Sequence, residues 1–536
     1  MTTARGTRHE SRARYDVIVV GGGHNGLVNA AYLARAGKRV VVLERRPLVG
    51  GAAVTEEVFP GFRFSVFSYV VSLLRPEIIR DLELPRHGLE ILPLESTVTP
   101  MFNGDYLGSW ADADLTRRDI ARHSRRDAEI YEEYSRLMGL MAMAVKPVLG
   151  MIPPDPTSLS PRDLRGLLRL GRHFQRLNER HFHLLYKLMT MSSADFLDEW
   201  FETDVLKATK SASGIIGTFM GPRTPGSAYV LLHHYMGEID GAFRAWGFAR
   251  GGTGAISESI RRAAEALGAE VRLNADVRRV RVLNGRATGV VLANGEELAA
   301  DVIVSSLDPK RTFLGLVEER ELPADFLDDI RRFKIRGSSG KVNLALSELP
   351  DFSCLPGRGP HLRGAISISP SLEYVERAYD DAKYGEFSRR PYMDVVIPSM
   401  IDPGMAPTGR HVMSIFVQYA PSTITGGWTD EKREAFGDAV IDALAPFAPN
   451  IRRAIIGRQV LTPADIERIT GLTEGNIFQG ELALHQLFFL RPSAGWAQYR
   501  TPVRGLWQCG SGTHPGGGIM GAGGRLAALE ILRGRA

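Results

Sequence analysis

Three glycines near the start of the chain, Gly21, Gly23 and Gly26, have the G-x-G-x-x-G spacing found in dinucleotide-binding turns. The first glycine permits a tight turn, and the second has no Cβ, so a pyrophosphate can approach the backbone. The third lets the next helix pack closely on the strand before it. Glu44 follows about 20 residues later, where a carboxylate is expected to bind a ribose hydroxyl. These four residues are suited to hold the phosphates and one ribose of a dinucleotide.

The segments around these glycines have the pattern of a strand, a helix and a second strand. Val17 to Val20 is an apolar, β-branched run typical of a buried parallel strand. The stretch 25–36 predicts a helix that ends at Gly37, with an N-terminus that presents free N–H groups to an anion. A second apolar run, 39–43, leads into the acidic residue. The chain has 57 Gly, so the motif alone can arise by chance, but these elements in this order favour dinucleotide binding.

Two further glycine-rich stretches are candidates for contact with the same ligand. Gly50 and Gly51 come just after Glu44, and they either continue along the ligand or form an ordinary loop. Near the other end, 510–524 holds many glycines and precedes a predicted helix over 526–533. Such a stretch brings backbone against a flat or anionic ligand and points a helix N-terminus at it. A flexible linker is a poor explanation, because an ordered helix follows.

Between these stretches the chain has helical and β-like segments. Residues 114–248 have a largely helical pattern, after a predicted hairpin over 97–110. A helix is predicted over 255–267. It precedes β-like runs at 270–273, 277–283, 287–292 and 298–305. No second G-x-G-x-x-G opens this block, which argues against a separate nicotinamide domain.

Composition and charge limit the classes of protein to consider. The chain has 536 residues, too many for one core, and its 44% hydrophobic and 24% charged residues are typical of a soluble globular protein. The net charge is +5, but no stripe of basic residues is interleaved with aromatics, so we expect no nucleic acid partner. We also expect no metal site. Residues 1–14 are polar and basic and lack the apolar core of a secretory signal. They are interpreted as a disordered tail, and the alternative is a short organelle-targeting segment, against which Glu10 argues.

Cysteine usage and hydropathy bear on the compartment. Cys354 and Cys509 lie far apart and form no C-x-x-C pair, so neither a disulfide framework nor a dithiol redox centre is expected. This usage fits a reducing cytoplasm. The longest apolar stretch, 137–152, is interrupted by Lys146 and Pro147 and is too short to span a bilayer.

A basic amphipathic helix is predicted to begin at Ser160-Pro161. Its leucines are interspersed with the arginines Arg165, Arg169, Arg172 and Arg176. One interpretation is a helix that lies on an anionic membrane surface. The other is a helix packed on the core, with its arginines in solvent.

Three separated parts of the chain resemble the flavin-binding domain of the amine oxidase and phytoene desaturase superfamily. The resemblance is carried by 22–28, 50–57, 229–234 and 510–518. The last of these is similar to the carotenoid desaturase and isomerase branch. The whole chain is similar to the group called pyridine nucleotide-disulfide oxidoreductase domain-containing protein 2.

The resemblance implies an α/β fold with a Rossmann-like FAD-binding domain and an α+β substrate domain. The FAD-binding domain would be assembled from 15–75, 250–308 and 501–536, after a disordered tail over 1–14. The substrate domain would comprise 76–249, which is largely helical, and 309–500.

By the same resemblance the cofactor is FAD, and its contacts can be assigned. The pyrophosphate would be bound by Gly21, Gly23 and Gly26, with Gly22 and Asn25 beside them, and on its other side by Gly510 and Ser511. The adenosine ribose would be bound by Glu44 and the adenine by Val277, while Arg45, Gly50 and Gly51 would lie along the phosphates and ribityl chain. The flavin pyrimidine edge would be met by Ile519, Met520 and Gly521.

The candidate catalytic residues are Lys341, His234 and Trp246. His234 and Trp246 come just before the second flavin-binding segment, where they either line the substrate pocket or pack in the core. Lys341 opens a segment, 341–346, that alternates as a half-buried strand. In amine oxidases a lysine on the strand that this segment resembles holds a water at flavin N5. The other interpretation is an edge-strand lysine that faces solvent.

The expected function is that of an FAD-dependent oxidoreductase, similar to carotenoid desaturases and isomerases, which abstracts hydride from a hydrophobic, polyene or lipid-like small molecule. One alternative is an amine or amino-acid oxidase that uses O₂. Another, from a different class, is a flavin-bearing interaction protein without turnover. We expect a cytoplasmic protein, and both peripheral contact with a membrane and oligomerisation are compatible with the sequence.

Overall fold

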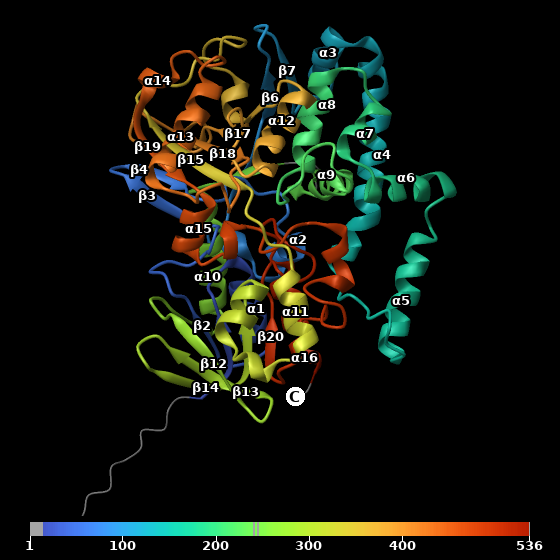
Figure 1. Ribbon diagram of the computed structural model, residues 1–536, viewed down its shortest axis with the longest axis vertical. Helices are drawn as coiled ribbons and strands as arrows, with labels where there is room; N and C mark the ends of the chain where they lie inside the picture. Colours follow the sequence, from blue (N-terminus) through green and yellow to red (C-terminus); the bar gives the residue numbers. More distant parts are fainter. Residues whose placement is uncertain (1–13, 240–241, 244–245, 535–536) are drawn as a thin grey trace, which may run out of the picture.

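The computed structural model describes residues 14–239, 242–243 and 246–534. The chain forms two lobes, each built around a seven-stranded sheet, and the two sheets lie one above the other in Figure 1. The described residues include no helix that is long and apolar enough to cross a membrane.

The sheet of the lower lobe joins strands from the start, the middle and the end of the chain. These are β1 (Tyr15–Val20), β2 (Val40–Leu43), β11 (Glu270–Arg272), β12 (Val277–Leu283), β13 (Arg286–Leu292), β14 (Glu297–Ser305) and β20 (Leu506–Gln508). Their order is β11-β2-β1-β14-β13-β12, and β20 also pairs with β14. The strands β11, β2, β1, β14 and β20 are parallel, whereas β12 and β13 are antiparallel additions.

Helices cover both faces of this sheet because its central strands are apolar throughout, as the sequence predicts. The helix α1 (His24–Arg35) follows β1 directly and contacts both α10 (Thr253–Ala266) and α16 (Ala522–Arg533). On the other face, α11 (Ala324–Arg332) packs against β14 and β12 in one apolar cluster. The helices predicted over 25–36, 255–267 and 526–533 are confirmed, although the last begins earlier, at Ala522.

The sheet of the upper lobe has the order β19-β15-β18-β17-β16-β6-β7. These strands are β6 (Ser96–Pro100), β7 (Tyr106–Trp110), β15 (Ser339–Leu346), β16 (Ala365–Ile368), β17 (Tyr392–Val396), β18 (His411–Gln418) and β19 (Ile455–Leu461). The predicted hairpin over 97–110 is the antiparallel pair β6–β7. The domain boundaries stay a prediction, but the strands of each sheet come from separate parts of the sequence.

The predictions for the segment 341–346 were wrong on burial. This segment belongs to β15, which is paired on both sides, with β18 and β19, so it is neither half-buried nor an edge strand. Val342 and Leu344 pack with α13 (Asp430–Leu444). The opposite face meets the segment 62–69, and the Asn343 amide donates to Val66 O at 3.3 Å. Lys341 is therefore buried rather than exposed to solvent.

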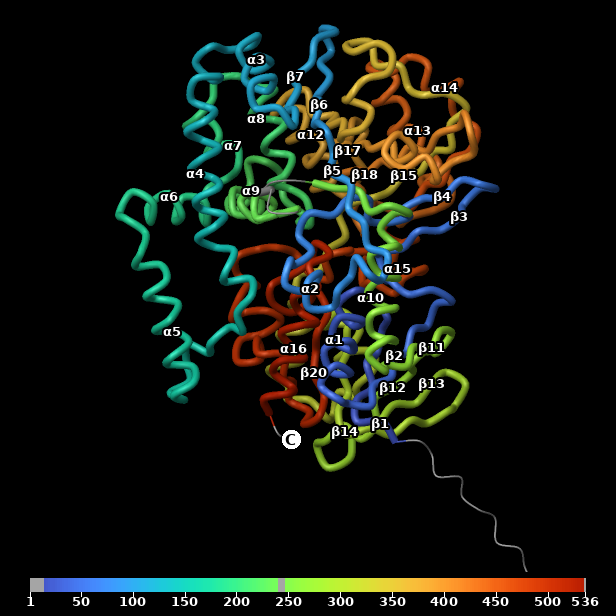
Figure 2. The backbone as a smooth tube through the Cα atoms, turned by 180° about the vertical axis from the view of Figure 1, so that it is seen from behind, coloured from blue at the N-terminus to red at the C-terminus, as the bar shows by residue number. Residues whose placement is uncertain are grey.

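The helical part of the upper lobe extends to one side of the molecule (Figures 1 and 2). It comprises α3 (Ala113–His123), α4 (Arg125–Leu149), α5 (Pro161–Phe174), α6 (Glu179–Thr190), α7 (Ser193–Asp198), α8 (Asp204–Ser211) and α9 (Ser227–Tyr235). The long helix α4 links the body of this lobe to α5 and α6, which stand away from both sheets (Figure 1). The largely helical pattern predicted for 114–248 is thus confirmed for most of its described residues.

Shorter elements connect the two lobes and complete the cover of the sheets. They are β3 (Thr55–Phe59), β4 (Phe62–Ser65), α2 (Pro76–Asp81), β5 (Ile91–Pro93), β8 (Glu238–Ile239), β9 (Ala242–Phe243), β10 (Gly247–Ala249), α12 (Leu372–Lys383), α14 (Ile451–Ala454) and α15 (Pro463–Thr470). The hairpin β3–β4 contacts the upper sheet, and β5 pairs with β10.

Candidate functional site

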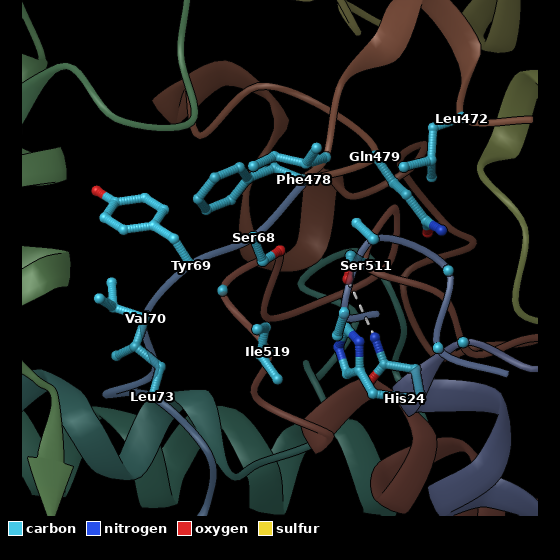
Figure 3. Close-up of a pocket in the computed structure, with 18 of the residues that line it drawn as sticks. His24, Ser68, Tyr69, Val70, Leu73, Leu472, Phe478, Gln479, Ser511 and Ile519 are labelled. Atoms are coloured by element: carbon cyan, nitrogen blue, oxygen red, sulfur yellow. Dashed lines mark hydrogen bonds between the residues drawn. The ribbon is translucent and has the colours of Figure 1, made fainter. Parts of the chain in front are cut away.

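A cavity lies where the glycine-rich segments of the lower lobe meet the upper sheet (Figure 3). Its wall comes from widely separated parts of the chain. The lining residues are Gly23, His24, Asn25, Gly50, Gly51, Ala52, Ala53, Ser68, Tyr69, Val70, Ser72, Leu73, Ile216, His234, Trp246, Ser306, Phe416, Leu472, Ile477, Phe478, Gln479, Ser511, Gly518 and Ile519. Glycines and small residues form one end, and apolar side chains form the other.

The glycine turn after β1 leaves open space where a phosphate would approach. A Cβ added at Gly23 would meet no atom within 4 Å, whereas one at Gly26 would lie 2.3 Å from Gly21 O. Gly26 is thus required for close packing, and Gly23 faces free space on the cavity wall. Gly23 is also the N-cap of α1 and supplies no side-chain cap, so the first N–H groups of the helix can receive an anion.

Glu44 lies at the end of β2, in the position predicted for ribose binding. Its carboxylate accepts hydrogen bonds from Gly22 N at 2.8 Å and Arg46 N at 2.9 Å. The side chain is mostly buried, and burial raises the pKa of this carboxyl group above its usual value. Two backbone donors thus fix the carboxylate beside the glycine turn, while its contact with a ribose stays a prediction.

The pair Gly50 and Gly51 runs beside the glycine turn. Gly50 forms a parallel bridge with Gly23, and its N–H donates to Gly22 O at 2.9 Å. A Cβ at Gly50 would lie 2.2 Å from Ala53 O, so this position also requires glycine. Of the two interpretations of this pair, the structure favours the one that continues the cavity wall over an unrelated loop.

The C-terminal glycine-rich segment closes the cavity from the other side. Asn25 Nδ2 donates to Ser511 Oγ at 3.1 Å, the hydrogen bond drawn in Figure 3. Gly518 and Ile519 follow on the wall, and Ile519 has a φ of 55°, which is unusual for a β-branched residue. Strain of this kind is often found at binding sites.

The remaining predicted cofactor contacts do not belong to the cavity wall. This group comprises Gly21, Gly22, Gly26, Glu44, Arg45, Val277, Gly510, Met520 and Gly521. The Arg45 guanidinium donates to Ile469 O at 2.6 Å, at the C-terminal end of α15. Val277 begins β12, close to Ala275, whose N–H donates to Glu44 O at 2.8 Å. The roles assigned to these residues stay predictions.

Two of the three predicted catalytic residues lie on the wall. The rings of His234 and Trp246 stack at 5.9 Å with an interplanar angle of 18°. His234 Nδ1 is 2.9 Å from Val230 O, which requires the hydrogen on Nδ1 and leaves Nε2 as the acceptor of the neutral ring. Burial lowers the pKa of this imidazole, so it is neutral near pH 7.

The third predicted catalytic residue, Lys341, lies behind the cavity wall. Its Nζ is 4.5 Å from the centroid of the Tyr69 ring, and it has no hydrogen-bond partner among the described residues. The Tyr69 hydroxyl donates to Asp394, and the Tyr69 ring stacks on Phe416 at 5.5 Å. Burial lowers the pKa of Lys341 to about 7 and raises the pKa of Asp394 to about 6.

Strand register explains this cluster of polar groups. Phe416 on β18 pairs with Lys341 on β15 and with Asp394 on β17, so the three side chains point to the same face of the sheet. Tyr69 covers this face, and Tyr69 and Phe416 form part of the cavity wall in front of Lys341 and Asp394. The predicted catalytic role of Lys341 stays a prediction.

Several wall residues were missed by the sequence analysis. His24 is the first residue of α1, its Nε2 has no partner among the described residues, and burial lowers its pKa to about 4. Its place inside the glycine motif was the signal that was overlooked. Tyr69, Phe478 and Gln479 have no local pattern, because their place on the wall depends on tertiary packing (Figure 3).

Comparisons with known proteins agree with this architecture. A family model described as flavin containing amine oxidoreductase matches residues 26–531. The chain is 41% identical to pyridine nucleotide-disulfide oxidoreductase domain-containing protein 2 of Rattus norvegicus, over 97% of this chain and 94% of that protein. It is 30% identical to one of the subunits of limonene dehydrogenase from Castellaniella defragrans, with the same two coverages, 97% and 94%.

A solved structure supports the fold. Cyclohexylamine oxidase from Brevibacterium oxydans has a TM-score of 0.56 to this protein, with 17% identity over 97% of this chain and 98% of that one. The predicted combination of a Rossmann-like domain and a substrate domain is therefore confirmed. The open space at Gly23, the uncapped N-terminus of α1 and the adjacent Gly50–Gly51 wall fit the diphosphate of FAD. The chain belongs to the flavin-containing amine oxidoreductase family, and it is an FAD-dependent oxidoreductase.

Proposed function

We propose that this enzyme dehydrogenates an uncharged, hydrophobic small molecule by hydride transfer to FAD. The observation that carries the proposal is the character of the wall: within 14–239, 242–243 and 246–534, the lining residues include no Asp, Glu, Lys or Arg. On this described wall an ammonium substrate would find no carboxylate, and an amino-acid substrate would find no guanidinium. Burial of an unpaired charge is costly, so the wall favours a neutral ligand over an amine or an amino acid.

Apolar side chains supply the binding energy for such a ligand. Tyr69, Val70, Phe416 and Phe478 face the cavity from three separate segments. A terpene or polyene that fills this end would gain about 25 cal/mol for each Å² of apolar surface buried. The kinship with limonene dehydrogenase supports a ligand of this class, as does the likeness of 510–518 to carotenoid desaturases.

The enzyme must also remove a proton. FAD, when bound, supplies the site that accepts the hydride with its electron pair. The second hydrogen of the dehydrogenated bond leaves as a proton, and we assign His234 Nε2 as its acceptor. The Nδ1 contact with Val230 O and the stacked Trp246 hold the ring in place for that role.

The test is anaerobic bleaching of the oxidised flavin by candidate substrates. Limonene and phytoene represent the apolar class, and a primary amine and an amino acid represent the alternative. We expect an apolar compound to bleach the flavin, and His234→Gln to slow the bleaching about a hundredfold with FAD content unchanged. Bleaching by the amine or amino acid alone would overturn the proposal. Bleaching by dithionite but by no compound in a wide metabolite screen would favour a flavin-bearing protein without turnover.

The cysteines are expected to play no part in the chemistry. Cys509 is buried in the lower lobe and Cys354 is partly buried in the upper one, and neither forms a disulfide. Burial raises the pKa of both thiols, which disfavours the reactive thiolate. The double variant Cys354→Ser, Cys509→Ala should keep its FAD and turn over within about twofold of the wild type. Lost turnover with FAD still bound would contradict this.

Two free cysteines also support the reducing cytoplasm that we propose as the location.

A further inference from the structure

The helix α5 is ordered but barely packed. Of its 14 residues, only Asp163 is buried. Leu164 and Leu168 are 48% and 53% exposed, which is unusual for leucines on an amphipathic helix. The helix stands beside the two lobes and apart from both sheets (Figures 1 and 2). Phe174, at the end of the helix, packs against the core cluster of α4, whereas Leu164 and Leu168 present their apolar surface to solvent.

Polar contacts at its two ends hold α5 in place. Near its start, the Arg162 guanidinium makes two hydrogen bonds of 2.6 Å to the buried carboxylate of Glu530 on α16. Near its end, His173 Nε2 is 2.7 Å from Ala144 O on α4. Because these contacts fix the helix, its exposed leucines are free to serve another purpose.

Positive charge is concentrated on the same helix. One groove is lined by Arg165, Leu168, Arg169, Arg172, His173 and Arg176. A second groove, between α5 and α16, shares Arg165 and Arg169 and adds Arg525 and Arg533. In the described part of the chain, no ion pair joins Arg165, Arg169, Arg172 or Arg176 to an acidic side chain. By contrast, Arg162 on α5 and Arg180 on α6 are paired with Glu530 and Glu133, although they belong to the same arm, the segment 161–190 formed by α5 and α6. The unpaired arginines lack a counter-charge.

The adjoining helix α6 adds exposed aromatic side chains. Phe182 is 52% exposed and Tyr186 is 65% exposed, and Leu159, just before α5, is 86% exposed. Aromatic and leucine side chains mixed with arginines are typical of helices that lie in the interface of a bilayer. Scattered exposed apolar residues need no explanation, but a group of them on one protruding arm does.

We propose that α5 and α6 form a docking surface for an anionic lipid bilayer. The leucines and aromatics enter the boundary between headgroups and acyl chains, and the four unpaired arginines bind lipid phosphates. This mode needs no spanning helix, and the described residues contain none. The proposal does not depend on the substrate of the flavin site, because it concerns a separate surface.

A second copy of the chain is a weaker candidate for this surface. A twofold contact places the same patch of each copy against the other. Such a contact would bring the four unpaired arginines of each copy together, against the single exposed carboxylate of Glu179 on α6, and like charges at that range repel. An anionic lipid surface has the complementary charge.

The test is flotation of the FAD-loaded protein with vesicles of phosphatidylcholine, with and without phosphatidylserine. We expect binding only to the anionic vesicles at low salt, and its loss near 1 M salt, where the Debye length falls to about 3 Å. The variant with Arg165, Arg169, Arg172 and Arg176 changed to Gln should bind about a thousandfold more weakly. The variant Leu164→Ser, Leu168→Ser keeps all the arginines and should still lose most of its binding at low salt.

A matched control changes four exposed arginines elsewhere, Arg63, Arg118, Arg278 and Arg358, to Gln. It removes the same net charge, so it should bind like the wild type if the arm is the docking surface. Equal loss in the control, or no binding of the wild type to anionic vesicles, would overturn the proposal. So would a change from dimer to monomer in the arm variant, measured by light scattering, since that would identify a second copy as the occupant.

Discussion

Gly23→Val protein is expected to fold normally and to lose its FAD. Gly23 has φ −67° and ψ 164°, which valine adopts without strain, and an added Cβ meets no protein atom within 4 Å. The valine methyls would instead fill the space that the pyrophosphate needs above the N-terminus of α1. We expect FAD to bind at least about a hundredfold more weakly, roughly 3 kcal/mol, and the purified protein to be colourless.

The measurement is FAD titration of the apoprotein, followed by its visible absorption, together with thermal unfolding of the apoprotein. Gly315→Val is a suitable control, because Gly315 is exposed and also has no neighbour within 4 Å of an added Cβ. A folded Gly23→Val protein that binds FAD as tightly as the control would show that the diphosphate does not lie at this turn.

Lys341→Met protein is expected to be more stable than the wild type near neutral pH. The pKa of Lys341 is about 7 in the folded chain and 10.5 in its ordinary state. Between these values the unfolded chain binds a proton that the folded chain lacks, so wild-type stability rises with pH across that window. The free-energy cost of burying the charged Lys341 ammonium is complete below pH 7 and absent above pH 10.5. A methionine carries no charge and avoids this cost, so we expect the free energy of unfolding to rise by about 4 kcal/mol at pH 7.

Thermal unfolding of the wild type and of Lys341→Met between pH 6 and pH 10.5 tests this prediction, because the difference between their stabilities should shrink as the pH rises. Lys334→Met is the control, because Lys334 is exposed and its loss should leave the pH dependence unchanged. A constant difference across the range would mean that Lys341 keeps its proton in the folded protein. Asp394, whose pKa burial raises to about 6, would then be its counter-ion.

The same variant has a second readout that bears on the predicted catalytic role of Lys341. Photoreduced wild-type and variant proteins can be compared in their rate of reoxidation by air. A fall of about a hundredfold would place the ammonium group at the flavin, and a change below about threefold, roughly 0.6 kcal/mol, would leave it a buried structural group.

The sequence predicted the parts of the site that depend on local patterns. The turn from Gly21 to Gly26, the helix after it and the position of Glu44 follow from glycine spacing and apolar runs over one short segment. The strand that carries Lys341 was also recognised. Its burial was not, because the cover comes from 62–69 and from α13, which are distant in sequence. Alternation along one strand carries no information about what packs on it.

The apolar end of the cavity shows the same limit. Tyr69, Ile216, Phe416 and Phe478 come from four parts of the chain, and nothing in their neighbours distinguishes them from core residues. His234 and Trp246 could be proposed only as pocket or core residues, and the ring stacking that places them on the wall is a tertiary contact.

The order of strands in the lower sheet has a consequence for biosynthesis. β1 pairs with β14, and β14 pairs with β20, so the parallel sheet is completed by residues near position 506. The C-terminal segment with Ser511 and Ile519 then closes the cavity. A ribosome that has released only the first 300 residues therefore exposes an unfinished parallel sheet with unpaired edges, a state prone to aggregation. We therefore expect FAD to be captured only when translation is nearly complete, so that the supply of cofactor matters at the end of synthesis rather than at its start.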